Sequence, residues 1–294
     1  MAQPVPRLRT GATSFIVIPA RLASTRLPRK LLLRETGKPL IQHTYEAAQR
    51  ATRPAGICVA TDHQEILEEV RSFGGQAEMT DPAAPSGTDR VAEVARRLTE
   101  VDIIVNVQGD EPELAGESID LVIRLLEGDC PDFRAATRSA DPKMGLSPSP
   151  NTEIETVPLE EQPEAVMATL ATPIRSRRQL EDPACVKVVF DHGGRALYFS
   201  RSPIPCPRQW EDRLLSADPP YFYQHVGLYA YRREFLLKLA EMPQSALEKI
   251  EQLEQLRVLE AGYPILVGVV DEPTFGIDTP EDYRKFVAKV GGTR

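Results

Sequence analysis

The strongest constraint on the fold of this chain is a repeated pattern in its N-terminal half. Three short apolar runs, at residues 15–18, 56–60 and 103–107, end in turn-forming or polar residues and are shorter than a typical helix. Between them, apolar residues recur at helical spacing over about 40–52 and 66–73. Because buried strands that alternate with helices are typical of βαβ units, the sequence predicts an α/β fold with a mostly parallel sheet flanked by helices.

A basic loop follows the first of these strands. After Pro19 the chain carries Arg21, Arg26 and Lys30, with small residues among them that let backbone amides approach a ligand. Ligands of open α/β sheets bind at the carboxyl ends of the strands, so these cations indicate a polyphosphate site. A solvated basic loop is the simpler alternative, because clustered Lys and Arg are often only surface charge. Neither a G-x-G-x-x-G pattern after the first strand nor a P-loop occurs, so the predicted phosphate site is of another kind.

Two further loops carry candidate ligand-binding residues. Asp110 follows the 103–107 strand closely, and Mg²⁺ takes one or two protein carboxylates together with phosphate oxygens, so Asp110 is the leading candidate for a metal ligand. Its neighbour Glu111 is expected to face solvent. The turn at residues 86–88 (Ser86, Gly87 and Thr88) precedes a helix whose N-terminal amides suit an anion or a base edge. Turn initiation by Asp110 and ordinary helix capping by Ser86 remain the alternatives.

Composition limits the size of the fold, the charge of its partners and the chemistry of its cysteines. The chain has 294 residues, 41% of them hydrophobic, which is enough for one large α/β unit with an appendage. Its 35 Lys and Arg against 43 Asp and Glu give a net charge of −8, which disfavours nucleic acid and anionic membranes as partners. The four cysteines lie far apart without C-x-x-C spacing, which argues against a zinc site and indicates free thiols in a reducing, cytoplasmic compartment. No apolar stretch approaches the roughly eighteen residues of a transmembrane helix.

The C-terminal half has a different pattern. Residues 143–163 are rich in Pro and acidic residues and are expected to form a mobile insertion. Asp191-His192-Gly193-Gly194 separates two β-rich runs and predicts a hairpin, so an antiparallel unit over about 186–231 is expected. Helices are expected over 233–242 and 246–261, a last strand over 265–269, and a final helix capped by Thr279 or Asp278.

Nine blocks of the sequence resemble, in the same order, those of the CMP-KDO synthetases (3-deoxy-manno-octulosonate cytidylyltransferases). They are IPARLASTRLPRKLL, ATDHQEI, PSGTDRVAEVA, IVNVQGDEP, KVVFD, LYFSRSPIP, HVGLYAYRREFL, LEKIEQLEQLRVLEAGY and GIDTPEDY. The resemblance implies a Rossmann-like nucleotide-diphospho-sugar transferase fold over residues 14–294, preceded by a flexible tail over 1–13. It also implies a smaller antiparallel substrate-binding or dimerisation subdomain, a homodimer, and synthesis of CMP-KDO and pyrophosphate from CTP and KDO for lipopolysaccharide biosynthesis.

The resemblance also assigns roles to individual residues. Triphosphate binding and catalysis are implied for Arg21, Arg26 and Lys30, with Asp110 as a further catalytic residue. The cytidine is expected to lie against Ala20 and the turn at Ser86, Gly87 and Thr88. Magnesium is expected on Asp110 and Asp278. The implied sugar-binding residues are Gln108, Arg201, His225, Tyr229 and Glu254; from the sequence alone, a core-edge role for His225 and a solvated helix face for Glu254 remain open.

Two features depart from the resembled family. Arg29 stands where the family usually has glycine and Leu31 where it has proline, which affects the backbone that carries Lys30. The acidic insertion at 143–163 is the second. A CMP transferase for another keto-acid sugar, such as amino-KDO or a sialic-acid-like sugar, is an alternative with the same fold, and Arg29 and Leu31 also leave open a nucleotide-binding regulator without turnover. Retention of Asp110, Asp278 and the three loop cations argues against the regulator.

Overall fold

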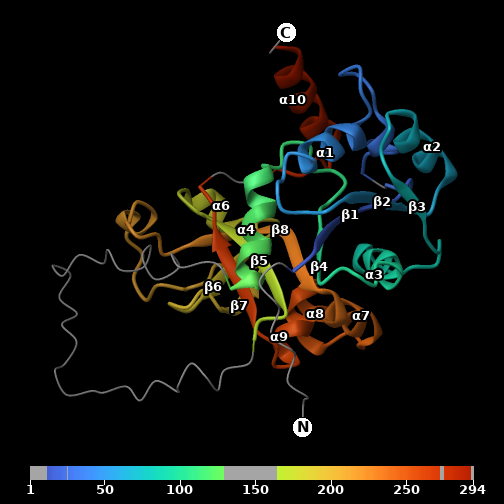
Figure 1. The fold of residues 1–294 in the computed structure, drawn as a ribbon. Helices are drawn as coiled ribbons and strands as arrows, with labels where there is room; N and C mark the ends of the chain where they lie inside the picture. Colours follow the sequence, from blue (N-terminus) through green and yellow to red (C-terminus); the bar gives the residue numbers. More distant parts are fainter. Residues whose placement is uncertain (1–11, 25, 129–163, 272–274, 293–294) are drawn as a thin grey trace.

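The structure, a computed structural model, describes residues 12–24, 26–128, 164–271 and 275–292 (Figure 1). Within these ranges nine strands form one mixed sheet, in the order β3-β2-β1-β4-β8-β5-β9, with β6 and β7 attached beside β8. The predictions for residues 143–163 and for the tail up to residue 11 fall outside the described residues. None of the described helices combines the length and the apolar composition needed to cross a bilayer.

The N-terminal half supplies the parallel part of the sheet. It consists of β1 (Ser14–Ala20), β2 (Ile57–Thr61), β3 (Ala77–Met79) and β4 (Ile103–Asn106). β1 lies between β2 and β4 and is parallel to both, with Val17 opposite Cys58 and Asn106. The predicted succession of parallel strands and crossover helices is therefore confirmed, and the carboxyl ends of β1 and β4 lie side by side.

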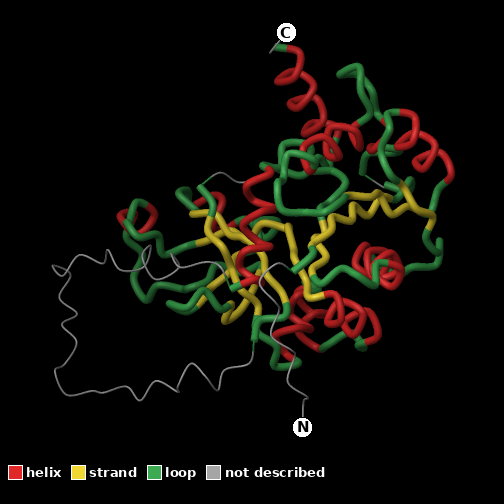
Figure 2. Tube along the Cα trace, in the orientation of Figure 1, coloured by secondary structure: helices red, strands yellow, loops and turns green. Residues whose placement is uncertain are grey.

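Helices cover both faces of the sheet, as Figure 2 shows in red around the yellow strands. Along β1 the side chains alternate, so that Ile16 and Ile18 enter one apolar core and Val17 enters the other. The first core packs against α1, α2, α4 and α10, and the second against α3, α7 and α9. The helices are η1 (Lys30–Leu32), α1 (Leu40–Ala48), α2 (Gln64–Ser72), α3 (Gly87–Arg97), α4 (Gly116–Glu127), α6 (Arg177–Glu181), η3 (Asp212–Leu215), α7 (Arg233–Glu241), α8 (Ala246–Glu251), α9 (Gln255–Glu260) and α10 (Pro280–Gly291).

The C-terminal half completes the sheet with antiparallel pairs. β8 (Tyr223–Arg232) runs antiparallel to both β4 and β5 (Met167–Pro173), and β5 is parallel to β9 (Ile265–Val269). The predicted hairpin is formed by β6 (Lys187–Phe190) and β7 (Ala196–Ser200). β8 is thus a central strand of the main sheet, and its register sets Tyr229 opposite Asn106 at the end of β4.

The prediction of a single helix over residues 246–261 is wrong. The structure has two short helices, α8 and α9, separated by residues 252–254, and the first of these, Gln252, has a left-handed backbone with φ 53°. Arg201 bonds the carbonyls exposed by this break, with Nε 2.7 Å from Glu251 O and Nη2 3.3 Å from Gln252 O. Apolar residues keep helical spacing through the break, so the sequence pattern alone could not reveal it.

Candidate active site

Three loops from distant parts of the chain meet beyond the ends of β1 and β4. A Cβ built on Gly109 would lie 3.0 Å from the carbonyl oxygen of Pro19, so the loops after these two strands are in direct contact. The loop before α10 joins them, because Ile277 N donates to Asp110 O at 2.9 Å. Of the two caps that the sequence predicted, Thr279 and Asp278, the structure has Thr279, which forms a capping box with Asp282 at the start of α10. The fold therefore brings Asp278 to the same place as Asp110.

Lys30 lies at the centre of this meeting point. Its Nζ contacts Asp110 Oδ2 and lies 3.0 Å from Asp278 Oδ1 and 3.2 Å from Ile277 O. Burial acts to lower the pKa of Lys30, but the two carboxylates outweigh it and the pKa is raised, so the ammonium stays charged. Arg26 lies at the same cluster, with Nη2 3.0 Å from Asp278 Oδ2. We call these four side chains the Lys30 cluster.

Arg21 and Ala20 lie where the basic loop leaves β1. Ala20 is buried as the last residue of the strand, opposite Thr61 of β2. Arg21 is exposed, and its guanidinium makes no ion pair with any described residue. Of the three predicted phosphate-binding cations, the structure therefore brings Arg26 and Lys30 to the acidic residues and leaves Arg21 facing solvent.

Arg29, which stands where the resembled family usually has glycine, adopts a backbone conformation that glycine favours. Its φ of 55° and ψ of 28° lie in the left-handed region, immediately before η1. The side chain forms an ion pair with Glu65 of α2, which ties this turn to the neighbouring helix. The turn that presents Lys30 therefore contains a left-handed arginine, at the cost of about 1 kcal/mol that a side chain pays in this region.

The turn at residues 86–88 is a helix cap that lies beside the end of β1. Ser86 Oγ accepts from Asp89 N at 3.1 Å, and Asp89 Oδ2 accepts from Ser86 N at 3.1 Å. These two hydrogen bonds form a complete capping box. A Cβ built on Gly87 would lie 3.6 Å from Pro19, so the turn lies beside the end of β1. The capping alternative is thus confirmed, and it coexists with a position next to the basic loop.

A buried arginine that the sequence analysis missed anchors this turn. Arg90 is 1% exposed, and its Nη2 lies 2.9 Å from Asp62 Oδ2 and its Nη1 3.4 Å from Asp81 O. It therefore joins the end of β2 to the loop that leads into α3. Its position on a helix among polar residues resembled a solvated face, so only its place on the buried side of α3 could have indicated this role.

Glu254 is directed at the same turn by the break between α8 and α9. It accepts hydrogen bonds from Thr88 Oγ1 and, at 3.4 Å, from Ser86 Oγ. Burial raises the pKa of Glu254, while the Thr88 hydrogen bond acts in the opposite direction. A solvated helix face is therefore excluded for this residue. Arg257 Nη2 lies 3.8 Å away and pairs more closely with Glu248, at 2.6 Å.

His225 is buried beside a bulge in β8. Its Nε2 lies 3.0 Å from Thr169 Oγ1, which also lies 3.1 Å from Val226 O and 2.9 Å from Leu228 O. Because the single hydroxyl proton of Thr169 goes to one of those carbonyls, Nε2 of His225 is the donor in the first bond. Burial lowers the pKa of His225 to about 3, so the ring is a neutral imidazole.

Tyr229 lies near His225 and contacts Gln255, a second residue that the sequence analysis missed. The two rings are 5.4 Å apart between centroids. Tyr229 OH donates to Gln255 Oε1 at 3.4 Å, and burial raises the pKa of this phenol. Gln255 is 4% exposed, and its Nε2 has no partner among the described residues. A glutamine in a polar helical stretch carries no sequence signal that separates this position from a solvated one.

Arg201 and Gln108 are less directly associated with the site. Gln108 Nε2 lies 3.5 Å from Asn106 Oδ1 at the end of β4. The guanidinium of Arg201 donates to Glu251 O and Gln252 O, and also to Pro183 O at 3.1 Å. No hydrogen bond within the described part of the chain joins Arg201 to His225 or Tyr229. The prediction that Glu111 faces solvent is wrong, because it is 8% exposed and folds inward beneath Gly227.

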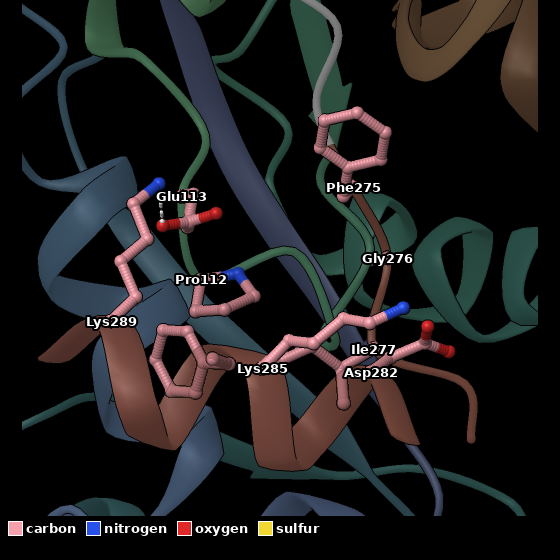
Figure 3. A pocket seen from close by; sticks show the side chains of 9 residues that line it. Pro112, Glu113, Phe275, Gly276, Ile277, Asp282, Lys285 and Lys289 are labelled. Atoms are coloured by element: carbon pink, nitrogen blue, oxygen red, sulfur yellow. Dashed lines mark ion pairs between the residues drawn. The ribbon is translucent and has the colours of Figure 1, made fainter. Parts of the chain in front are cut away.

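A pocket of about 330 Å³ lies on the other side of the loop before α10 (Figure 3). Phe275, Ile277 and Phe286 supply its apolar lining. Lys289 pairs with Glu113 across it at 2.5 Å. Two lining residues contact the Lys30 cluster: the carbonyl of Ile277 accepts from Lys30, and Asp282 accepts from the backbone N–H of Asp278 at 3.4 Å. The cavity is therefore a neighbour of the three-loop meeting point and contains none of the predicted phosphate-binding residues.

Comparison with known proteins places the chain among enzymes of one family. A family model described as cytidylyltransferase matches residues 15–267. A 3-deoxy-manno-octulosonate cytidylyltransferase of Rhodopirellula baltica is 46% identical over 277 residues, which cover 94% of this chain and 98% of the relative. The chain belongs to the 3-deoxy-manno-octulosonate cytidylyltransferase family.

Further members of this cytidylyltransferase family support the assignment. A relative of the same name from Geotalea daltonii is 44% identical, covering 93% of this chain and 96% of the relative. A solved CMP:2-keto-3-deoxy-manno-octonic acid synthetase complexed with CTP superposes with a TM-score of 0.78 at 36% identity, covering 96% of this chain and all of that chain. The expected nucleotidyltransferase fold is therefore confirmed. The roles of the individual site residues stay predictions.

Proposed function

We propose that this protein transfers CMP from CTP to the anomeric hydroxyl of KDO and releases pyrophosphate. The observation that carries the proposal is the Lys30 cluster, in which two loop cations meet Asp110 and Asp278 at the strand ends of a cytidylyltransferase fold. Relatives with over 40% identity along nearly the whole chain are named for this activity. A homodimer in the cytoplasm, working in lipopolysaccharide biosynthesis, is part of the proposal.

In this proposal the charged residues of the basic loop act on the triphosphate. Arg21, Arg26 and Lys30 neutralise the phosphates and the charge that develops on the pyrophosphate leaving group. The turn at residues 86–88 and the chain at Ala20 hold the cytidine, and the pairing of Thr88 with Glu254 connects that turn to the sugar side. The protein then works mainly by positioning the hydroxyl for in-line attack on the α-phosphorus.

The remaining predicted residues are assigned to the sugar. His225 is neutral and Tyr229 is protonated, so both offer polar groups without charge. Gln108 and Glu254 would complete the set of hydroxyl partners. Arg201 is engaged with three backbone carbonyls, so its binding to the sugar carboxylate would require that these bonds open.

Magnesium fits the donor atoms of the Lys30 cluster. Asp110 and Asp278 offer carboxylate oxygens and Ile277 a carbonyl oxygen, which are the hard donors that Mg²⁺ takes together with phosphate oxygens and water. When bound, the ion would supply positive charge to the phosphates and favour loss of the proton from the attacking hydroxyl. Asp110 and Asp278 would hold it, while Arg26 and Lys30 would turn to the phosphates.

The two buried thiols of the described residues do not suit a covalent intermediate. Burial raises the pKa of Cys58 to about 12 and that of Cys185 to about 11, so neither thiol forms a thiolate at neutral pH. Within the described residues these two thiols lie in apolar clusters away from the Lys30 cluster. Direct displacement at the α-phosphorus is therefore the mechanism that the side chains support.

The test is pyrophosphate release with CTP and a panel of keto-acid sugars. KDO should give the fastest release, and amino-KDO or a sialic-acid-like sugar should be slower by orders of magnitude if the pocket hydrogen-bonds the KDO hydroxyls. Asp110→Ala should abolish release while the protein stays folded. Release with no sugar in the panel would refute the enzyme, and preference for another sugar would correct the substrate.

A further inference from the structure

We propose that Lys30 occupies the cation position between Asp110 and Asp278 in the nucleotide-free protein and competes there with the divalent metal ion. The inference rests on the proposed function, because it takes these two aspartates as the metal ligands. It adds to that function a role for Lys30 before CTP arrives. The lysine would keep the two carboxylates paired and would make metal binding depend on the nucleotide.

The contacts of Nζ are those of a bound cation. Two carboxylates and one backbone carbonyl surround it: Asp110 Oδ2 in direct contact, Asp278 Oδ1 at 3.0 Å and Ile277 O at 3.2 Å. These are the same oxygen donors that a divalent ion would take. The side chains of Lys30 and Asp110 are 15% and 22% exposed, so the pair is only weakly screened by water. An ammonium and a divalent cation repel each other strongly at such separations, so both cannot use this pair of carboxylates together.

The triphosphate provides the alternative partner for Lys30. Its backbone is fixed by η1 and by the buried Leu31, but a lysine side chain is long and flexible, so Nζ can move while the turn stays in place. Phosphate oxygens of CTP would take the ammonium away from the carboxylates and leave Asp110 and Asp278 free for the metal. Nucleotide and metal would then each strengthen the binding of the other.

Arg26 pairs with the same acid but contributes less. It contacts the other oxygen of Asp278, at 3.0 Å, and its side chain is 65% exposed. Screening by water weakens such an exposed pair. Removal of the Arg26 side chain should therefore increase the affinity for the metal ion less than removal of the Lys30 side chain.

The experiment measures Mn²⁺ binding to the nucleotide-free full-length protein by electron paramagnetic resonance of the free ion. Lys30→Met should bind Mn²⁺ at least about tenfold more tightly than the natural protein, because the competing charge is gone. Lys30→Gln serves as a second variant if the methionine disturbs the fold. The matched control is Lys38→Met, which removes a lysine from an ion pair with Glu46 outside the cluster and should leave the affinity unchanged.

Addition of CTP without sugar gives the second arm. Saturating CTP should tighten Mn²⁺ binding to the natural protein, and this gain should be much smaller in Lys30→Met. Asp110→Asn in the Lys30→Met background should remove the tight binding. Unchanged affinity in both Lys30 variants, with CTP-dependent binding still lost in Asp110→Asn, would overturn the competition and leave the proposed metal site intact. Indifference of Mn²⁺ binding to Asp110→Asn and Asp278→Asn in every state would overturn the metal site itself.

Discussion

Residue 29 has a left-handed backbone conformation that is uncommon for an arginine. Arg29 holds φ 55° and pairs with Glu65. Arg29→Gly and Arg29→Ala both remove that ion pair, so they differ only in the cost of the left-handed backbone. We expect Arg29→Gly to be more stable than Arg29→Ala by about 1 kcal/mol in urea unfolding, with turnover retained in the glycine variant. Equal stability of the two variants would mean that the turn relaxes out of this conformation.

A buried neutral histidine makes stability depend on pH. The unfolded chain protonates His225 near pH 6.5, whereas the folded protein keeps it neutral down to about pH 3, so protonation favours the unfolded state between these values. Stability should therefore fall as the pH drops from 6.5 towards 3, with a contribution from His225 of up to about 1.4 kcal/mol per pH unit. His225→Gln, which keeps a donor for Thr169, should unfold in urea with a shallower pH dependence.

Two comparisons make the histidine prediction specific. His192→Asn changes an exposed histidine in the β6–β7 turn and should keep the pH dependence of the natural protein. If His225→Gln also loses stability between pH 6.5 and 4.5 as steeply as the natural protein, the acid sensitivity comes from other groups.

At the scale of elements, the break between α8 and α9 is what directs Glu254 at the turn of residues 86–88. Gln252 has φ 53°, a conformation that β-branched residues resist most. We expect Gln252→Val to lose about 1–2 kcal/mol in stability and to lower kcat/KM by displacing Glu254. Gln252→Gly should keep both. Full activity in the valine variant would show that Glu254 does not depend on the break.

The loop before α3 depends on its buried arginine. Arg90→Met leaves Asp62 without its partner and should cost about 3 kcal/mol in urea unfolding and raise the KM for CTP. Arg97→Met, on the same helix, removes exposed ion pairs to Glu78 and Glu93 and should cost less than about 1 kcal/mol. Similar losses in the two variants would contradict an anchoring role for Arg90.

An element could be predicted where a local sequence pattern encodes it. The parallel strands were predictable because β-branched runs alternate with helical spacing. The pairing of β8 between β4 and β5 was not, since no local pattern encodes which strand becomes a neighbour. Charge and loop position indicated Lys30 and Asp110, whereas Asp278 was identified through family resemblance. Arg90 and Gln255 were missed because a polar residue on a helix gives the same pattern whether it is buried or solvated.

At the scale of the whole molecule, Arg232 holds together the two ends from which residues 129–163 depart. Its Nε donates to Ala165 O at 2.8 Å, and its Nη2 to Leu126 O at 3.4 Å. A short connection can therefore span this point without strain. Replacement of residues 143–163 by a short Gly-Ser linker should leave the melting temperature and the rate of pyrophosphate release nearly unchanged. A folded deletion variant that loses activity would show that the segment takes part in the reaction.

Lys30 connects the beginning of the chain with its middle, through Asp110, and with its C-terminal part, through Asp278. During translation the ribosome releases Asp278 long after Lys30 and Asp110 have emerged. A nascent or prematurely terminated polypeptide that stops before Asp278 therefore lacks one acid of the cluster, whatever else of it has folded. In such fragments Lys30 would keep Asp110 as a partner and lack Asp278, so the position between the two carboxylates forms only after the C-terminal part has been made.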